Sequence, residues 1–465
     1  MKNKFLTFIL LSNLLTPTLL AQTDPLSQRI DSLMQAAHRI GIFNGNVIVI
    51  SKGQTIYKAA VGFADGSRQY PLTMQKRFDI GSIAKEFNGI SIMLLAEKKK
   101  LSAAAPIRKY LPELPAWADS IRISHLLSYT SGLPATAANT DQGVLNELLV
   151  LKNLANTPGK AYIYSYANVY LQQRIVEQVS GLKYQAFVEK NILKPLEMKH
   201  TVMDLPLNDT TMAVAFNNKF INEKPRETTS GWPRLTAEDL YRFVAAVDSY
   251  KLVGKTSVQQ LSEHFGEGES SLGEAKFENG GLVWHQHHGS NYNYESLVTH
   301  DLKNDRFVIL TTSNQNFKVR QLTTAILSIL DHKPYTVPKR SLYLELREEM
   351  LADFDAGVAF YRTATEQKKD VYDLSFPIGD LVNTGKFLMR RNRIDDAIRV
   401  FTLGLLLDLQ DKDYGIACQF IAEAYKQQGK GDMAILYAQR AIRKDPDNKI
   451  ARSILEQIGT SGKND

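Results

Sequence analysis

The segment RFDIGSIAKEFNG, residues 77–89, places Ser82 three residues before Lys85 at the start of a predicted helix. Positions i and i+3 share one helix face, so the Lys85 amino group can reach the Ser82 hydroxyl. A serine beside a lysine of lowered pKa is a candidate nucleophile for acyl transfer, and a helix N-terminus favours the negative charge that develops there. Ser180 and Lys183 have the same spacing, and serine often caps helices, so the tetrad alone leaves both interpretations open.

Two further segments carry side chains suited to proton transfer. AYIYSYANVYL, residues 161–171, supplies phenols that also suit a half-buried surface, and HQHHGS, residues 285–290, supplies imidazoles. His285 and His287 share one face of a predicted strand, like the start of a zinc hydrolase site, but the expected aspartate is absent. We therefore predict neither a metal nor a cofactor. The chain also lacks a G-x-S-x-G elbow, which argues against an α/β-hydrolase nucleophile.

The elements around these residues indicate a mixed architecture. VIVI and TIYKAAVGF, on either side of a turn at Lys52, Gly53 and Gln54, predict a β-hairpin, and NYESLVTHDLKNDRFVILTTSN predicts two more strands. Crowded apolar residues between Ser82 and Leu101 predict a buried helix. Strands flank a helix-rich middle without βαβ alternation, so we predict the α+β class.

The N-terminus predicts export. MKNK precedes an apolar run that ends at Ala21, which indicates a signal peptide over residues 1–21 and a periplasmic or secreted protein. Asn13 and Pro17 interrupt the run, and no later segment is suited to span a membrane. The single cysteine, Cys418, excludes an internal disulfide. A net charge of +7 gives little support for nucleic-acid binding.

A length of 465 residues exceeds one typical domain. We predict a main domain at 25–332, a connector and helix at 333–375, and helical repeats at 376–460. The repeats follow from small and aromatic residues spaced as in a tetratricopeptide helix pair, with a degenerate upstream copy around Ala397. The repeats form either a groove for a protein partner or a cap on the main domain. The residues that carry the pattern are Ala422, Tyr425, Gly429, Ala434, Tyr437, Ala441 and Pro446.

Four ordered segments resemble the serine β-lactamase and penicillin-binding-protein superfamily, in particular its branch of class C β-lactamases, DD-peptidases and esterases. The resemblance covers roughly residues 35–330. RFDIGSIAKEFNG resembles the nucleophile motif, and KYLPELPAW with ISHLLSYTSGLP resembles the family segments on its C-terminal side. PGKAYIYSYANVYLQQRIVEQVSG resembles the Tyr-x-Asn segment, and WHQHHGSNYNYESLVTHD the strand bearing Lys-Thr-Gly or His-x-Gly. The resemblance implies an antiparallel sheet with flanking helices and a helical cluster.

The resemblance also implies roles for individual residues. Ser82 would attack a carbonyl, while Lys85 and a tyrosine would pass its proton to the leaving group. The backbone N–H groups of Ser82 and Ser290 would bind the oxyanion. His287 would orient the tyrosine or a substrate carboxylate, and Gly289 would let the substrate approach. Because imidazole is largely neutral at pH 7, His287 favours ester or peptide substrates over carboxylate-bearing β-lactams.

The tyrosine element departs from the family pattern. Aligned without a gap, the triplet is Tyr164, Ser165 and Tyr166, so a tyrosine replaces the asparagine. A shift by two restores Tyr-x-Asn with Tyr166 and Asn168. We predict Tyr164 as the catalytic phenol, with Tyr166 and Asn168 near the substrate. Tyr129 in SYTSGLP, where relatives often have histidine, is interpreted as structural.

The predicted function is that of an exported serine hydrolase, which forms an acyl-enzyme with an ester, a D-amino-acid peptide or a β-lactam. The alternative is a weak or inactive β-lactamase-like binding protein whose helical repeats hold a partner. Retention of the serine, lysine, tyrosine and histidine favours the enzyme, and Tyr166 in place of asparagine favours the alternative.

Overall fold

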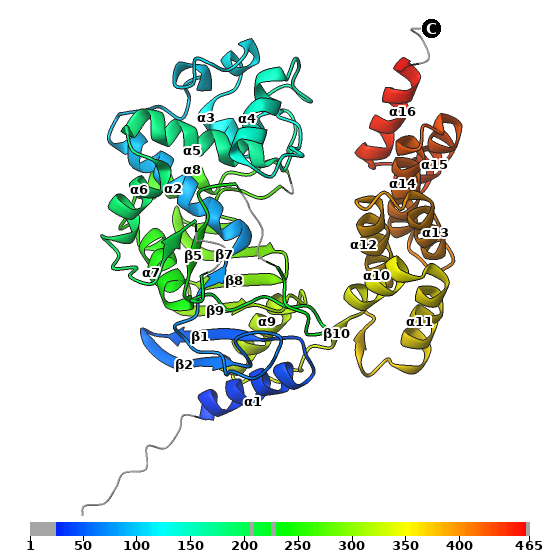
Figure 1. Cartoon of the computed structure of the whole chain (residues 1–465), viewed down its shortest axis with the longest axis horizontal. Helices are drawn as coiled ribbons and strands as arrows, with labels where there is room; N and C mark the ends of the chain where they lie inside the picture. Colours follow the sequence, from blue (N-terminus) through cyan, green and yellow to red (C-terminus); the bar gives the residue numbers. More distant parts are fainter. Residues whose placement is uncertain (1–24, 205–208, 225–228, 267, 462–465) are drawn as a thin grey trace, which may run out of the picture.

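The computed structural model describes residues 25–204, 209–224, 229–266 and 268–461. The predicted signal peptide at 1–21 lies outside these residues. A six-stranded antiparallel sheet, in the order β2-β1-β9-β8-β7-β6, forms the centre of the first part of the chain (Figure 1). Its strands are β1 Gly45–Ser51, β2 Gln54–Val61, β6 Glu274–Glu278, β7 Gly281–Asn291, β8 Tyr294–Asp301 and β9 Arg306–Thr312.

Both predicted strand pairs are confirmed. β1 and β2 are joined by Lys52 and Gly53, which have φ angles of 52° and 71°. Positive φ at both central residues is the geometry of a tight hairpin turn, which a lysine and a glycine can supply. β8 and β9 pair from Glu295 with Thr312 to Asp301 with Arg306.

Helices cover both faces of the sheet, and the alternation of side chains along each strand fills two cores. In β1, Val47 and Val49 face one core, whereas Ile48 and Ile50 face the other. The α+β class with an antiparallel sheet is confirmed. The helices against the first core are α1 Pro25–Arg39 and α9 Val319–Leu330, and those against the second include α2 Ala84–Glu97 and α7 Ala237–Asp248.

The helix α2 is preceded by a short 3₁₀ turn, η1, at Gly81–Ile83. Ser82 lies within this turn and makes no capping hydrogen bond, so its interpretation as a helix N-cap is wrong. α2 is buried on most sides, as predicted, but it ends at Glu97, short of Leu101. A polar pair, Lys85 and Glu86, is buried along with its apolar residues, which requires ionic partners elsewhere in the fold.

The remaining helices of this region gather on the α2 side of the sheet (Figure 1). A three-stranded sheet lies among them, in the order β3-β5-β4. These elements are η2 Ile107–Lys109, η3 Ala116–Asp119, α3 Ile123–Leu127, α4 Asp141–Val150, α5 Tyr166–Ser180, α6 Tyr184–Val188, η4 Glu189–Leu193, α8 Lys255–Leu261, β3 Phe78–Asp79, β4 Val202–Met203 and β5 Pro233–Leu235.

The C-terminal region is an array of paired helices, as the repeat pattern predicts. Ala422, Ala434 and Ala441 are fully buried between helices, and Tyr425 stacks on Tyr437 with ring centres 5.7 Å apart. No helix of the described residues is long and apolar enough to cross a membrane. The helices are α10 Leu342–Ala352, α11 Phe354–Gln367, α12 Pro377–Met389, α13 Ile394–Gly404, α14 Asp411–Gln427, α15 Gly431–Lys444 and α16 Lys449–Ser461.

This array extends further toward the N-terminus than the predicted repeats. Residues 333–375, predicted as a connector and one helix, contain the packed pair α10 and α11 together with the short strands β10 Arg340–Ser341 and β11 Tyr372–Asp373. Gly357 allows the close contact of α11 with Met350 of α10. The pair lacks the small and aromatic spacing of the later repeats, so the sequence pattern gave no signal for it.

Candidate active site

The hydroxyl groups of Ser82 and Tyr164 are hydrogen-bonded, with their oxygens 2.7 Å apart. Ser82 is held in η1, and Tyr164 lies two residues before α5, whose N-cap is Ser165. The Tyr164 side chain is 53% exposed, which leaves the phenol open to a substrate. The two oxygens are close enough for a proton to pass directly between them.

Lys85 lies beneath this pair with only 2% of its side chain exposed. Its ammonium nitrogen is 2.6 Å from Oε2 of Glu269 and 4.6 Å from the centre of the Tyr164 ring. Within the described residues, no hydrogen bond joins this nitrogen to Ser82. Burial alone would raise the pKa of Glu269, but the Lys85 ammonium outweighs burial and holds that pKa below its ordinary value. The lysine is therefore a paired cation under the phenol.

Tyr129 packs against the Tyr164 ring. Its ring stacks on that of Tyr164 at 5.8 Å, with 15° between the planes, and lies 5.1 Å from the Lys85 nitrogen. Tyr129 has a φ of 56°, and its buried phenol has a pKa raised well above the ordinary value by desolvation. Tyr129 is therefore a neutral packing residue that fixes the orientation of Tyr164.

Strand β7 packs closely against η1 at two glycines, Gly289 of β7 and Gly81 of η1. A Cβ at Gly289 would overlap the carbonyl oxygen of Ile80 and lie 2.8 Å from the Ser82 nitrogen, and a Cβ at Gly81 would overlap the Ser290 backbone. Strand β6 pairs with β7 only as far as Gln286, so the segment after it has an edge without a β6 partner. The two glycines thus bring the backbone at Ser82 and Ser290 into close contact, and the amides of these residues are candidates for an oxyanion site.

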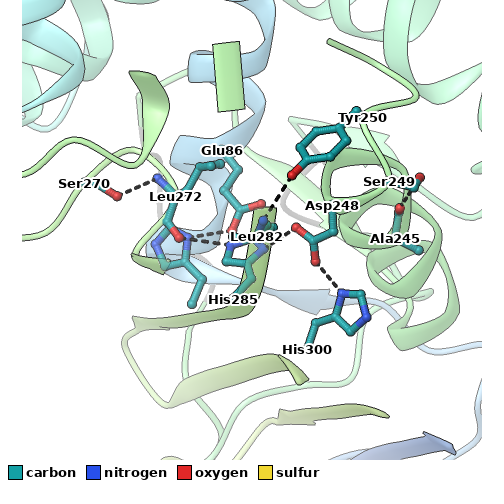
Figure 2. A network of polar contacts seen from close by, with 11 residues as sticks. Glu86, Ala245, Asp248, Ser249, Tyr250, Ser270, Leu272, Leu282, His285 and His300 are labelled. Atoms are coloured by element: carbon teal, nitrogen blue, oxygen red, sulfur yellow. Dashed lines mark hydrogen bonds and ion pairs between the residues drawn. The ribbon is translucent and has the colours of Figure 1, made fainter. Parts of the chain in front are cut away.

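A buried network of charged side chains joins β7 to two helices (Figure 2). His287 Nδ1 is 2.7 Å from Oε1 of Glu86, the residue after Lys85. His285 Nδ1 is 2.7 Å from Oδ1 of Asp248, at the end of α7, and its Nε2 is 3.4 Å from the same oxygen of Glu86. Asp248 also contacts His300 Nδ1 of β8 at 2.7 Å (Figure 2). The network thus ties the strand that carries Ser290 to the helix that follows Ser82.

The charges of this network follow from its geometry. Burial alone would raise the pKa of Glu86 and Asp248, but the adjacent imidazoles outweigh burial and hold both carboxyl pKa values low. Burial would lower the pKa of His285, but its two carboxylate neighbours raise that pKa well above the ordinary value. For His287 burial dominates and lowers the pKa. His285 is therefore the cation between two carboxylates, and His287 is neutral.

Glu86, His285 and His287 are close enough to one another to suggest a metal-ligand set. However, His285 Nε2 also lies 3.0 Å from the Leu272 carbonyl oxygen, and its Nδ1 faces Asp248. Both nitrogens of a protonated His285 are thus donors to oxygen, and neither has a lone pair for a metal. The donor set fits an ion network better than a metal site.

A cavity of about 390 Å³ opens over Ser82. Sequence reasoning did not predict four of its lining residues, Tyr162, Gly268, Glu269 and His288. Tyr162 and His288 lie beside predicted site residues, whereas Gly268 and Glu269 lie outside every motif segment. Glu86 was missed as well, although its place directly after Lys85 in a buried helix is a signal that it has an ionic partner. The lining residues are Ser82, Tyr162, Tyr164, Gly268, Glu269, His288 and Ser290.

The β-lactamase family model matches residues 26–331. This chain belongs to the β-lactamase family. A tetratricopeptide-repeat model matches residues 417–450. Protein flp of Staphylococcus aureus (strain MW2) is 24% identical to the chain over 343 residues, which cover 68% of each protein.

Two solved structures share the fold of this β-lactamase-family domain. A class C β-lactamase superposes with a TM-score of 0.57 at 20% identity, covering 67% of this chain and 97% of that one. The D-amino acid amidase from Ochrobactrum anthropi, in complex with L-phenylalanine, has a TM-score of 0.56 at 17% identity, covering 66% and 99%. These similarities establish a common fold.

Of the predicted site residues of this β-lactamase-family chain, Ser82, Tyr164 and Ser290 line the cavity. Lys85 lies beneath the Tyr164 ring and Gly289 packs against η1, whereas the other three make contacts elsewhere. Tyr166 stacks on Trp232 and donates a hydrogen bond to the Ser230 carbonyl oxygen, 3.4 Å away. Asn168 is fully buried. Its side-chain carbonyl oxygen accepts a hydrogen bond from the Ser131 hydroxyl, and its side-chain nitrogen donates one to the carbonyl oxygen of Ser165, the N-cap of α5. His287 faces Glu86 instead of Tyr164. The structure thus gathers Ser82, Lys85, Tyr164, Gly289 and Ser290 and keeps the other three beneath or beside them.

Proposed function

We propose that this β-lactamase-family protein is a serine hydrolase that works through an acyl-enzyme on an ester, peptide or β-lactam carbonyl. The observation that carries the proposal is the 2.7 Å hydrogen bond between the hydroxyls of Ser82 and Tyr164. In the first step, the Ser82 oxygen attacks the carbonyl carbon and its proton passes to a Tyr164 phenolate. The carbonyl oxygen takes up the negative charge beside the amides of Ser82 and Ser290.

Collapse of this intermediate breaks the bond to the leaving group, which receives the proton from Tyr164. A water molecule then attacks the acyl carbon and gives a proton to the Tyr164 phenolate. When this second intermediate collapses, the acid leaves and Tyr164 returns the proton to the departing Ser82 oxygen, which restores the Ser82 hydroxyl and the phenolate. The Lys85 ammonium, 4.6 Å from the phenol ring, stabilises the phenolate in both halves of the cycle. In this mechanism Lys85 acts as a fixed cation, because Glu269 already accepts its hydrogen bond.

The substrate range that we propose leans toward esters and peptides. A carboxylate-bearing β-lactam needs a fixed positive charge near the β7 edge, but the neutral His287 is buried beneath that edge. The name of the amidase neighbour, which acts on D-amino acid amides, supports an amide or ester substrate. We further propose that the protein is exported, since residues 1–21 have the composition of a signal peptide.

The test of this function is covalent labelling by a fluorophosphonate. Ser180 provides a matched control, because it has the same spacing to a lysine but its hydroxyl accepts a hydrogen bond from the Leu182 amide. We expect labelling of wild-type protein and Ser180→Ala, and none of Ser82→Ala. Labelling that survives Ser82→Ala in a folded protein would overturn the mechanism.

A second candidate function is recognition without turnover. The position of the family asparagine is occupied by Tyr166, whose hydroxyl is turned toward Ser230. The C-terminal helices, with their tetratricopeptide-repeat match, would then hold a protein partner. A folded protein that binds substrate analogues reversibly, with no adduct and no hydrolysis, would favour this candidate over the enzyme.

A further inference from the structure

The carboxylate of Glu269 places a negative charge in the lining of the cavity over Ser82. Glu269 binds Lys85 through Oε2 only, and no hydrogen bond to its Oε1 occurs within the described residues. Its side chain is 47% exposed, whereas the Lys85 side chain is 2% exposed. A substrate in the cavity therefore meets the carboxylate, while the balancing ammonium lies below the surface.

The loop that carries Glu269 is held firmly in place. On one side, a Cβ at Gly268 would overlap the Tyr162 ring, so the backbone rests directly on that ring. On the other side, Ser270 and Ser271 are fully buried, and the Ser271 hydroxyl donates a hydrogen bond to the Leu127 carbonyl at 2.8 Å. The position of the carboxylate is thus fixed before a substrate arrives, which reduces the cost of binding.

The cavity offers no compensating cation to an anionic substrate. Of its described lining residues, none is a lysine or an arginine. His288 also lines it, but its Nε2 is 2.9 Å from Oε1 of the buried Glu295. His288 is therefore engaged by Glu295, and the most exposed charged group of the lining is the Glu269 carboxylate, whose partner Lys85 is buried.

We propose that this site selects carbonyl substrates that carry an ammonium group on the acyl side, and that Glu269 is the residue that selects them. The substrate class is that of amino-acid esters and amides or peptides with a free amino group. The inference rests on the proposed serine hydrolase function and adds a charge preference to it. An acyl carboxylate would face Glu269 at short range and be repelled, whereas an ammonium would pair with the free Oε1.

The experiment compares three phenyl esters whose acyl chains have equal length and end in an ammonium, a methyl or a carboxylate group. These are the esters of β-alanine, butyric acid and succinic acid, assayed on the full chain after subtraction of spontaneous hydrolysis. The readout is the ratio of kcat/KM for the ammonium ester to that for the carboxylate ester. A ratio is used because Glu269→Gln also disturbs Lys85, and that effect is common to both substrates. Glu263→Gln removes an equal charge at an exposed position outside the cavity lining.

We expect the ratio to be about tenfold in wild-type protein and Glu263→Gln, and to fall below about twofold in Glu269→Gln. Raising the salt concentration should shrink the wild-type ratio, because exposed charges are screened. A wild-type ratio at or below one, or a ratio unchanged by Glu269→Gln, overturns the inference while the serine hydrolase function stands. Failure to cleave any ester, together with no fluorophosphonate adduct, overturns the function itself.

Discussion

The hydroxyl oxygen of Tyr164 lies 2.7 Å from that of Ser82, whereas the hydroxyl of Tyr166 contacts the carbonyl oxygen of Ser230. Two tyrosines two residues apart thus face different surroundings, one above the cavity and one against Trp232. The α5 N-cap at Ser165 sits between them and turns the chain into the helix. Tyr164 is therefore better placed than Tyr166 to carry the Ser82 proton.

Tyr164→Phe should lower the rate of acylation by about 100- to 10,000-fold, the usual contribution of a proton carrier. The measurement is the single-turnover rate with an activated ester. Tyr166→Phe is the matched control and should change this rate little, since its phenol is directed toward Ser230 and Thr229 and does not line the cavity. Equal losses in the two variants would contradict the assignment of Tyr164.

Gly289→Ala should lower kcat/KM by about 100-fold, because a new Cβ would push β7 and the Ser290 amide away from Ser82. Gly281→Ala on the same strand is the control, since its nearest atom to a Cβ would be 3.6 Å away. Circular dichroism would establish that both variants fold. A fully active, folded Gly289→Ala protein would mean that the two amides do not act together on the oxyanion.

His285→Asn should reduce the free energy of unfolding by about 3 to 5 kcal/mol, because it leaves two buried carboxylates without their cation. Denaturant titration gives this value. His332→Asn, at an exposed turn, should have little effect. A loss below about 1 kcal/mol in His285→Asn would contradict the charge assignment of the network.

Protonation of His285 should make the free energy of unfolding depend on pH. The pKa of His285 is raised in the folded state, so its contribution to stability is fully present below its ordinary pKa of 6.5. That contribution is lost as the pH rises through the folded-state pKa. Unfolding free energies measured from pH 6 to 10 should therefore fall more steeply in wild-type protein than in His285→Asn. Parallel pH profiles would show that His285 is not protonated in the folded protein.

Deleting the chain after Leu330 should spare ester hydrolysis, because every cavity-lining residue precedes that point. The deletion removes Asp373, the 2.7 Å ion-pair partner of the nearly buried Lys318 at the N-cap of α9, so stability should fall. Lys318→Met in the shortened chain should recover part of the loss. A folded but inactive shortened protein would show that the helical array contributes to catalysis.

The sequence predicted those parts of the protein that depend on local pattern. Strand-forming runs on either side of turn residues located β1, β2, β8 and β9, and the spacing of small and aromatic residues located the later helical repeats. The proximity of Ser82 to Lys85 along the chain made the nucleophile segment visible as well.

The sequence did not predict features that depend on contacts between distant segments. Glu269 reaches Lys85 across 184 positions of the chain, and His287 reaches Glu86 across 201. Neither carboxylate belongs to a spaced motif, and long-range pairing leaves no periodic trace. The orientation of the Tyr166 and Asn168 side chains likewise depends on Trp232 and Ser131, which lie outside the tyrosine segment.

The most direct test of the proposed mechanism is intact-mass spectrometry of the protein after brief exposure to a fluorophosphonate, a penicillin or a short activated ester. Ser82→Ala is run beside wild-type protein, and a folded state is verified for both. The proposed mechanism predicts a mass increase of one acyl or phosphonyl group in wild-type protein, located on Ser82 by peptide mapping and absent from the variant. A wild-type protein unmodified by all three probes, or an adduct that persists in Ser82→Ala, would contradict it.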